Sequence, residues 1–132
     1  MGAHATLFGD ETSKMLSIRG LLAAVCLLAQ SFAAQAQEAA IARCSATGVV
    51  AVGKGNTLSA AGASAAANCE QGGGERYCCE IVADTQYAQC IAYAQSEFNE
   101  ATGYGETPEQ AKADALAICG SDCRPIAAPC RY

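Results

Sequence analysis

The sequence predicts an α+β fold of two β-β-α-β repeats that form a mostly antiparallel sheet with two helices on one face, stabilised by disulfides. Three observations support this prediction. An alanine-rich segment with helical spacing occurs twice, at an offset of fifty residues. Short strand-like segments bounded by glycine flank each copy. The chain is also rich in cysteine, which indicates disulfides. Helices gathered on one face of an antiparallel sheet are typical of this fold class.

The first 36 residues have the pattern of a secretory signal peptide. Lys14 and Arg19 precede the apolar run 21–29, and the segment 34–36, Ala-Gln-Ala, matches the small-residue motif of a cleavage site. We therefore expect cleavage before Gln37. The apolar run is shorter than the roughly 20 residues that a membrane-spanning helix needs, so we expect no span in the mature protein.

Two features of this leader stay open. Two acidic residues precede the basic ones, so translation starts either at Met1 or at Met15. Lipidation of Cys26 is an alternative to cleavage after Ala36, although Val25 is larger than the residue that normally precedes a lipidated cysteine.

The cysteines behind the leader form an even set. Nine cysteines occur in the chain, and eight remain without Cys26. They are Cys44, Cys69, Cys78, Cys79, Cys90, Cys119, Cys123 and Cys130. Behind a signal peptide, such a set predicts four disulfides and a secreted or periplasmic protein. Zinc binding is the alternative, but no Cys-x-x-Cys pair occurs and the single histidine, His4, lies in the leader.

The composition limits the partners and the size of the core. The net charge is −5 and no basic stripe occurs, so we expect neither nucleic acid nor an anionic membrane surface as a partner. A mature chain of about 96 residues is one small domain with a limited core. Its apolar residues are mostly alanine, so each disulfide is expected to matter, by on the order of 2–4 kcal/mol.

The repeat is visible when residues 40–70 are laid over residues 90–120. The motif Gly-x-Gly-x-Thr occurs at 53–57 and again at 103–107, and Cys69 falls on Cys119. Alanines match easily by chance, whereas this glycine-threonine frame and the cysteine do not. We therefore expect residues 37–132 to form a single domain of two repeats, about 40–89 and 90–132.

A helix is expected to begin at the threonine of each motif. Thr107 is an N-cap residue, with Pro108 at the first helical position and Gln110 completing a capping box. Gly120 is expected to end this helix in the left-handed helical region. Thr57 caps the first helix in the same way, although a glycine inside that helix weakens it by about 1 kcal/mol relative to alanine.

Extended segments surround the two helices. Residues 49–52 are rich in valine and bounded by glycine, and residues 90–94 open the second repeat. Residues 79–83 resemble residues 123–127, and each segment is expected to be the strand that follows a helix. Pro125 places the second of these strands at a sheet edge or a strand start.

Together these motifs resemble domain-of-unknown-function family 4189. The resemblance rests on the Ile-Ala strand, the Gly-x-Gly-x-Thr turn, the alanine-rich helix ending in Cys-Gly, and the cysteines around the short strand that follows. It covers the mature chain. The second repeat, from Cys90 to Cys130, fits better than the first, where Cys44 and the adjacent Cys78 and Cys79 depart from the pattern. The resemblance implies a small secreted bacterial domain of two such units, and it supplies no activity and no catalytic residue.

The available residue types exclude most catalysis. The mature chain has no histidine, so it lacks an imidazole base and any Ser-His-Asp or Cys-His pair. We expect no catalytic, cofactor-binding or metal-binding residue. Two carboxylate pairs, Glu97 with Glu100 and Glu106 with Glu109, are the candidates for a glycosidase, although a polar turn and a first helical turn also explain them. The Gly-x-Gly-x-Thr turn suits an anion at a helix N-terminus, but it lacks the lysine of a phosphate loop.

Tyrosines indicate where a partner would bind. Tyr93 and Tyr104 replace Arg43 and Lys54 of the first repeat, so they can mark a surface that only one repeat presents. Tyrosine suits protein-binding surfaces, and packing over the alanine core is the alternative. We therefore expect a secreted, non-catalytic module that binds or inhibits another protein. The alternatives are a small carboxylate-dependent hydrolase of cell-envelope glycans and a purely structural envelope protein.

The repeat also constrains the disulfide pairing. Cys44 and Cys78 have no counterpart in the second repeat, so we expect them to pair; the alternative is a strained bridge between the adjacent Cys78 and Cys79. Cys69, Cys79 and Cys90 correspond to Cys119, Cys123 and Cys130, so with Cys90 counted in the first repeat three cysteines remain on each side, and at least one bridge should join the repeats. The other expected pairs are Cys69–Cys79, Cys119–Cys123 and Cys90–Cys130.

Overall fold

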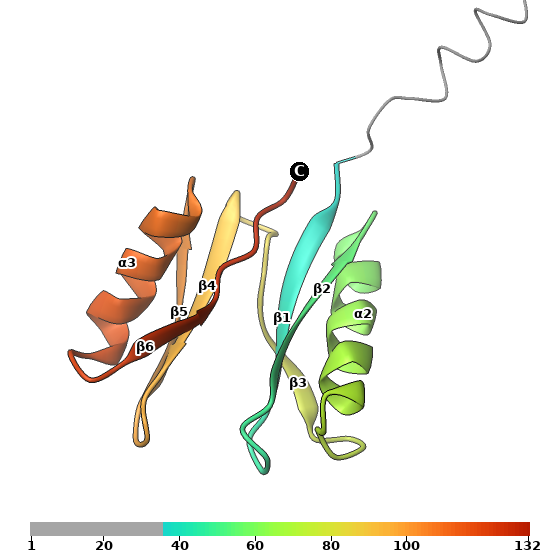
Figure 1. Cartoon of the computed structure of the whole chain (residues 1–132). Coiled ribbons are helices and arrows are strands. Elements are labelled where there is room, and N and C mark those ends of the chain that lie inside the picture. Colours follow the sequence, from blue (N-terminus) through green and yellow to red (C-terminus); the bar gives the residue numbers. More distant parts are fainter. Residues whose placement is uncertain (1–35) are drawn as a thin grey trace, which may run out of the picture. The chain divides into compact units, whose positions relative to one another are not determined.

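The computed structural model describes residues 36–132 (Figure 1). The elements follow in the order β1 (Glu38–Cys44), β2 (Val50–Gly55), α2 (Leu58–Gln71), β3 (Cys79–Asp84), β4 (Cys90–Gln95), β5 (Glu100–Gly105), α3 (Pro108–Cys119) and β6 (Arg124–Ala127). The order strand, strand, helix, strand thus occurs twice, and the predicted α+β class is confirmed. The apolar run of the expected signal peptide, Cys26 and both candidate start residues lie outside the described residues.

The strands form two three-stranded antiparallel sheets. Their strand orders are β2-β1-β3 and β5-β4-β6, so the first strand of each half is the central one. Helix α2 packs against the first sheet and α3 against the second (Figure 1). The antiparallel pairing was predicted, but the division into two sheets was not. Apolar alternation predicts which face of a strand is buried, and it does not tell whether strands of different repeats share a ladder.

The faces of the two sheets that carry no helix pack against each other. Ile41 of β1, together with Ile91 and Tyr93 of β4, is at most 1% exposed, and these side chains form one apolar cluster with Ala83 of β3. The described part of the chain therefore has four layers, in the order helix, sheet, sheet, helix (Figure 1). The large apolar residues lie between the sheets, whereas alanine and cysteine dominate under the helices.

Glycine at positions 53 and 103 lets each helix lie directly on its sheet. A Cβ atom on Gly53 would lie 2.0 Å from the Ala65 nitrogen, and one on Gly103 would lie 2.2 Å from the Ala115 nitrogen. Both distances are far below van der Waals contact, so no larger residue fits without moving the helix. The Gly-x-Gly-x-Thr motif is thus explained by the close approach of a helix to a strand.

Both helices begin where the sequence predicts. Thr57 Oγ1 accepts a hydrogen bond from the Ala60 N–H (3.1 Å), and Thr107 Oγ1 accepts one from the Gln110 N–H (3.2 Å). The Gln110 side chain in turn accepts a bond from the N–H of Glu106, one residue before the expected capping-box position (3.0 Å). Neither α2 nor α3 is long and apolar enough to cross a membrane.

The end of α3 differs from the prediction. Gly120 has φ 117° and ψ 173°, so its φ is positive but its backbone is not left-handed helical. The disulfide between Cys119 and Cys123 explains this conformation, because it draws the chain back toward the helix end within four residues. Gly120 still caps the helix, since its N–H donates to Leu116 O (3.0 Å).

All the cysteines of residues 36–132 are paired, with no free thiol among them. The four disulfides are Cys44–Cys78, Cys69–Cys79, Cys90–Cys130 and Cys119–Cys123. The predicted pairing is therefore confirmed, and the adjacent Cys78 and Cys79 bond to different partners. Cys78, just before β3, is bonded to β1, and Cys79, the first residue of β3, is bonded to α2.

One step of the disulfide argument was wrong, because no disulfide joins the two halves. Cys90 is the first residue of β4, and it also forms a backbone bridge with its disulfide partner Cys130. The expectation counted Cys90 with the first repeat, whereas β4 pairs only with β5 and β6. Each half therefore holds two disulfides, and the halves are joined by the chain segment between β3 and β4 and by non-covalent contacts.

Candidate functional site

Tyr93 lies between the two sheets and not on the surface. Its side chain is 1% exposed, and its hydroxyl donates a 2.8 Å hydrogen bond to Glu100 Oε2. Burial, and then this hydrogen bond, raise the pKa of the Tyr93 hydroxyl well above its ordinary value. The expectation that Tyr93 belongs to a partner surface is therefore wrong, and the alternative of packing in the core is correct.

Arg43 of the first sheet binds the same carboxylate from the other side. Its Nη1 donates to Glu100 Oε1 (2.8 Å), and its Nη2 lies 2.6 Å from Glu100 Oε2. Such a two-pronged pair combines charge with fixed geometry. Arg43 and Tyr93 occupy matching positions in the two repeats, fifty residues apart. The difference between the repeats at this position thus builds a polar contact between the halves.

This contact argues against the glycosidase alternative. Glu97 and Glu100 line one hollow of about 270 Å³ beside Arg43, which at first suits a pair of catalytic carboxylates. However, Glu100 already accepts bonds from Arg43 and Tyr93, whereas a general acid or a nucleophile needs a carboxyl that is free to act on substrate. The other candidates, Glu106 and Glu109, are exposed at the start of α3.

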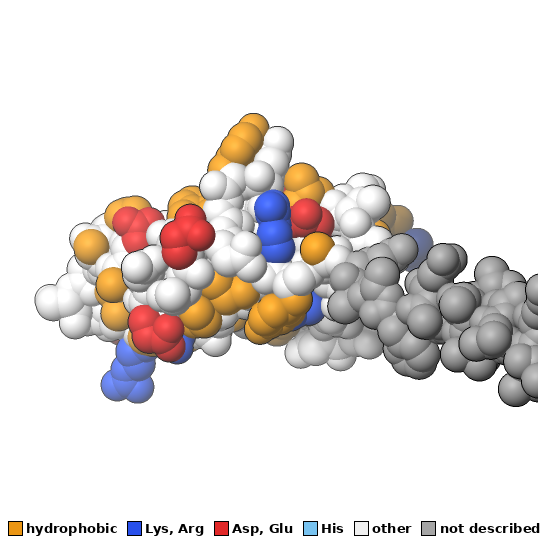
Figure 2. Space-filling model, turned by 90° about the horizontal axis from the view of Figure 1, so that it is seen from above, with side chains coloured by type: hydrophobic (Ala, Val, Ile, Leu, Met, Phe, Trp, Pro, Cys, Tyr) orange, Lys and Arg blue, Asp and Glu red, His pale blue; other side chains and the backbone are white. Residues whose placement is uncertain are grey.

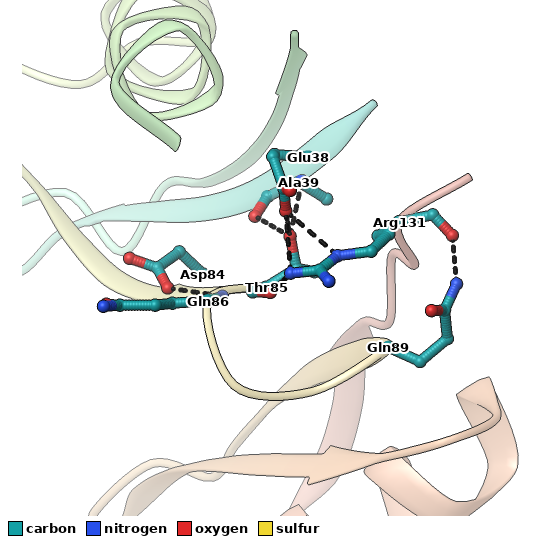
Figure 3. Close-up of polar contacts among 7 residues, drawn as sticks. All are labelled: Glu38, Ala39, Asp84, Thr85, Gln86, Gln89 and Arg131. Carbon is teal, nitrogen blue, oxygen red and sulfur yellow. Dashed lines mark hydrogen bonds and ion pairs between the residues drawn. The ribbon is translucent and has the colours of Figure 1, made fainter. Parts of the chain in front are cut away.

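A second polar network joins the halves around Glu38 (Figure 3). Glu38 Oε2 accepts bonds from Thr85 Oγ1 (2.6 Å) and Arg131 Nε (3.1 Å), and Arg131 Nη2 donates to the backbone oxygen of Thr85. Thr85 is fully buried and also accepts a bond from the Ala39 N–H (3.0 Å). Sequence reasoning missed this network, because no motif marks its three side chains, which are far apart in the sequence.

Neither a metal site nor an anion site is built from the described residues. Within residues 36–132 no group of three or more His, Cys, Asp or Glu side chains is arranged to hold a metal ion. The glycines before each helix are packed against that helix, so they do not form an open cradle for an anion.

A hollow with exposed tyrosines lies along strand β3. Its volume is about 250 Å³, and it is lined by residues 81–84, Gln86, Tyr87 and Tyr104. Side chains alternate between the two faces of a strand, so a hollow touched by four consecutive residues follows the open edge of β3. We call this surface the β3-edge hollow.

The β3-edge hollow carries large side chains that water reaches. Tyr87 is 88% exposed, Tyr104 45% and Ile81 43%. The structure thus places Tyr104 on the surface, as the sequence led us to expect, and it adds Tyr87, which sequence reasoning left out. Tyr87 follows β3 in the chain whereas Tyr104 belongs to β5, so both halves contribute to this surface.

Other exposed apolar side chains are scattered. The view in Figure 2 shows hydrophobic groups separated by polar and charged side chains on that face. Tyr132 is 73% exposed, and the Lys54 Nζ lies 3.8 Å from the centre of its ring. Phe98 is 83% exposed on the loop between β4 and β5. Single exposed apolar residues of this kind need no functional explanation.

Comparisons with known proteins identify no relative of this chain. No family model, no curated protein and no solved structure matches it. The resemblance to domain-of-unknown-function family 4189 therefore stays a prediction from the sequence motifs.

Proposed function

We propose that this protein is a secreted or periplasmic, disulfide-stabilised, non-catalytic module that binds another protein through the β3-edge hollow. The observation that carries the proposal is the gathering of Ile81, Tyr87 and Tyr104 around one hollow at an open sheet edge. Tyrosine is enriched among the residues that dominate protein–protein binding energy, because a stiff ring buries much area and its hydroxyl still bonds.

The disulfides support the compartment. Four disulfides in a domain of this size are typical of proteins from oxidising compartments. The signal-peptide pattern before Gln37 agrees with export. Membership of domain-of-unknown-function family 4189 and an origin of the two halves by duplication are part of the same proposal. Both rest on the sequence motifs and on the repeated order of elements.

Site-specific photo-crosslinking in the cell that exports the protein tests the proposal. A photoreactive phenylalanine derivative at Tyr87 should crosslink to one defined protein. The same group at Phe98, an equally exposed aromatic outside the hollow, is the control and should not.

The variant Tyr104→Lys provides a second control, because lysine stands at the matching position 54 of the first half and the fold accepts it there. It should abolish the crosslink from position 87 while leaving the far-ultraviolet circular dichroism spectrum unchanged. Identical adducts from positions 87 and 98, or no adduct from position 87, would refute the proposal.

A further inference from the structure

We propose that the partner bound at the β3-edge hollow contributes an extended, basic segment that pairs with β3 as an additional strand. This inference rests on the proposed function, in which the same surface binds a protein. It names the form in which the partner binds and its charge. Addition of a strand to an open sheet edge is a common mode of recognition, in which backbone hydrogen bonds supply affinity and side-chain pockets supply specificity.

Three of the four edge strands in the described part of the chain are closed to an added strand. On β2, the backbone oxygen of Val52 accepts a 2.8 Å bond from Asn68 Nδ2 of α2. On β5, the N–H of Tyr104 donates a 2.9 Å bond to Asp114 Oδ2 of α3. Strand β6 has only four residues, and one of them is Pro125, which has no N–H to donate. Such features are known to protect sheet edges.

Strand β3 is longer than β6, with six residues, and contains no proline. It pairs with β1 on one side only. The Thr85 N–H donates a 3.0 Å hydrogen bond to Ala39 O, so the backbone of Thr85 faces β1. In an antiparallel pair, residues whose backbone N–H and C=O face the partner strand alternate with residues whose N–H and C=O face away from it. The backbone N–H and C=O of Asp84 therefore face the open side. Within residues 36–132 no side chain bonds to the backbone of residues 80–84.

The open edge of β3 offers only a short stretch of backbone to an added strand, and exposed tyrosine side chains lie beside this stretch. A β-bulge makes Val82 an extra residue opposite β1, since Ile41 pairs with Ala83 while Ala42 pairs with Ile81. A bulge disturbs the regular ladder, so an added strand makes few backbone bonds. The exposed side chains of Tyr87 and Tyr104 beside the same edge then supply the remaining contacts.

The charges on β3 disfavour a second copy of this chain and favour a basic partner. Glu80 is exposed at one end of the strand and Asp84 lines the hollow at the other. If β3 paired antiparallel with its own copy about Val82, the Glu80 and Asp84 carboxylates of both copies would lie along one short pairing stretch, where like charges repel each other. Among the described residues no lysine or arginine lines the hollow, so Lys or Arg residues in a foreign strand would meet the Asp84 carboxylate there and the exposed Glu80 at the other end of β3.

A displayed library of random peptides provides the probe. Peptides selected on the wild-type protein and counter-selected on Tyr104→Lys should carry Lys or Arg and lack Pro in their central positions. A selected peptide should slow the hydrogen exchange of the Asp84 amide at least about tenfold, because a new backbone bond protects it. The amide of Tyr104, which already bonds to Asp114, is the internal control and should change little.

The double variant Glu80→Gln/Asp84→Asn tests the charge argument. The variant keeps the size of both side chains. In the wild type the Gln86 N–H donates to Asp84 Oδ1 (3.0 Å), and the side-chain oxygen of asparagine at position 84 can still accept this bond. Binding of a selected basic peptide should weaken at least about tenfold, the size of one good interfacial contact. Glu106→Gln/Glu109→Gln removes two charges outside the hollow and should leave binding unchanged.

The outcomes distinguish this inference from the proposed function. If position 87 crosslinks to a protein but selected peptides leave the Asp84 amide unprotected, the surface binds proteins and strand addition is refuted. Selection of acidic or uncharged peptides, with equal binding to both double variants, refutes the basic partner. If crosslinking finds no partner and selection gives no peptide that distinguishes wild type from Tyr104→Lys, both proposals fail together.

Discussion

Arg43 and Glu100, which come from different sheets, form a two-pronged ion pair with N–O distances of 2.8 and 2.6 Å. Tyr93 binds the same carboxylate from the second sheet, so three side chains share one site between the halves. No disulfide joins the halves. Polar contacts of this kind, together with the apolar cluster around Ile41 and Ile91, therefore determine whether the two sheets stay packed.

Replacement of Glu100 should weaken the packing of the two sheets. Glu100→Ala leaves the Arg43 guanidinium and the Tyr93 hydroxyl without their partner, so the free energy of unfolding should fall by about 1–3 kcal/mol. We expect the lower half of that range, because the Arg43 and Glu100 side chains are 22% and 41% exposed and water screens the charge. Urea denaturation with disulfides intact measures the change.

A double-mutant cycle provides the control for this prediction. Arg43→Met with Glu100→Ala should show a coupling energy of about 0.5 kcal/mol or more, as contacting residues do. Glu97→Ala, which changes an exposed carboxylate on the loop just before β5, should stay within about 0.5 kcal/mol of wild type. Equal losses for Glu97→Ala and Glu100→Ala would contradict the role of the ion pair.

Tyr93 should make stability depend on pH in the alkaline range. Its pKa is raised in the folded state, so folding favours the protonated hydroxyl. This contribution is fully present below the ordinary tyrosine pKa of about 10 and is lost as the pH rises above that value. In a titration followed by tyrosinate absorbance, one of the five tyrosines should ionise late. Tyr93→Phe should remove the late phase, whereas Tyr87→Phe should leave it intact.

Local features of this fold were predictable from the sequence, and contacts between the halves were not. The helix starts at Thr57 and Thr107 and the four disulfides follow from capping chemistry and from the position of each cysteine in the repeat. The division into two sheets and the burial of Tyr93 depend on how the repeats pack together. An apolar face looks the same in a sequence whether it covers a helix or a second sheet.

The candidate binding surface was only half predictable for the same reason. Tyr104 drew attention because it differs from Lys54 in the first repeat. Tyr87 has no such signal, and it lies in the same hollow only because the end of β3 lies beside β5 of the other half. The Glu38, Thr85 and Arg131 network likewise joins residues that no sequence spacing connects.

Two Gly→Ala changes should shift stability in opposite directions. In Gly103→Ala the new methyl group would lie 2.2 Å from the Ala115 nitrogen, so α3 must move away from its sheet, at a cost of about 3 kcal/mol or more. In Gly62→Ala the methyl group meets only the Ile81 side chain, at 3.6 Å, and the helix gains about 1 kcal/mol in propensity. Thermal unfolding measures both. A neutral Gly103→Ala would contradict the explanation of the glycine motif.

Removal of a single disulfide should cost more stability when the loop that it closes is longer, and the cost should rise with the logarithm of the loop length. Cys44–Cys78 spans 34 residues and Cys119–Cys123 spans 4. In the chain-entropy model these loops correspond to about 4 and about 2 kcal/mol. Replacing each pair by alanine should therefore lower the free energy of unfolding more for Cys44–Cys78, as denaturant titration would measure. Peptide mapping without reduction checks the pairing itself, and Cys44 bonded to any residue other than Cys78 would contradict the structure.

Arg131 should stabilise the contact between the halves through the geometry of its guanidinium group. Arg131 Nε donates a hydrogen bond to the Glu38 carboxylate, and Arg131 Nη2 donates one to the Thr85 backbone oxygen, so one planar guanidinium group binds both partners (Figure 3). Arg131→Ala should lower the free energy of unfolding by about 1–3 kcal/mol, because the Glu38 carboxylate, whose side chain is 22% exposed, loses its cation. Arg131→Lys keeps the charge but cannot make both bonds, so it should recover only part of the loss.

Arg124→Ala, which removes an exposed arginine from β6, is the matched control and should be nearly neutral. Full recovery by lysine would show that only charge matters here, and it would contradict the geometric argument.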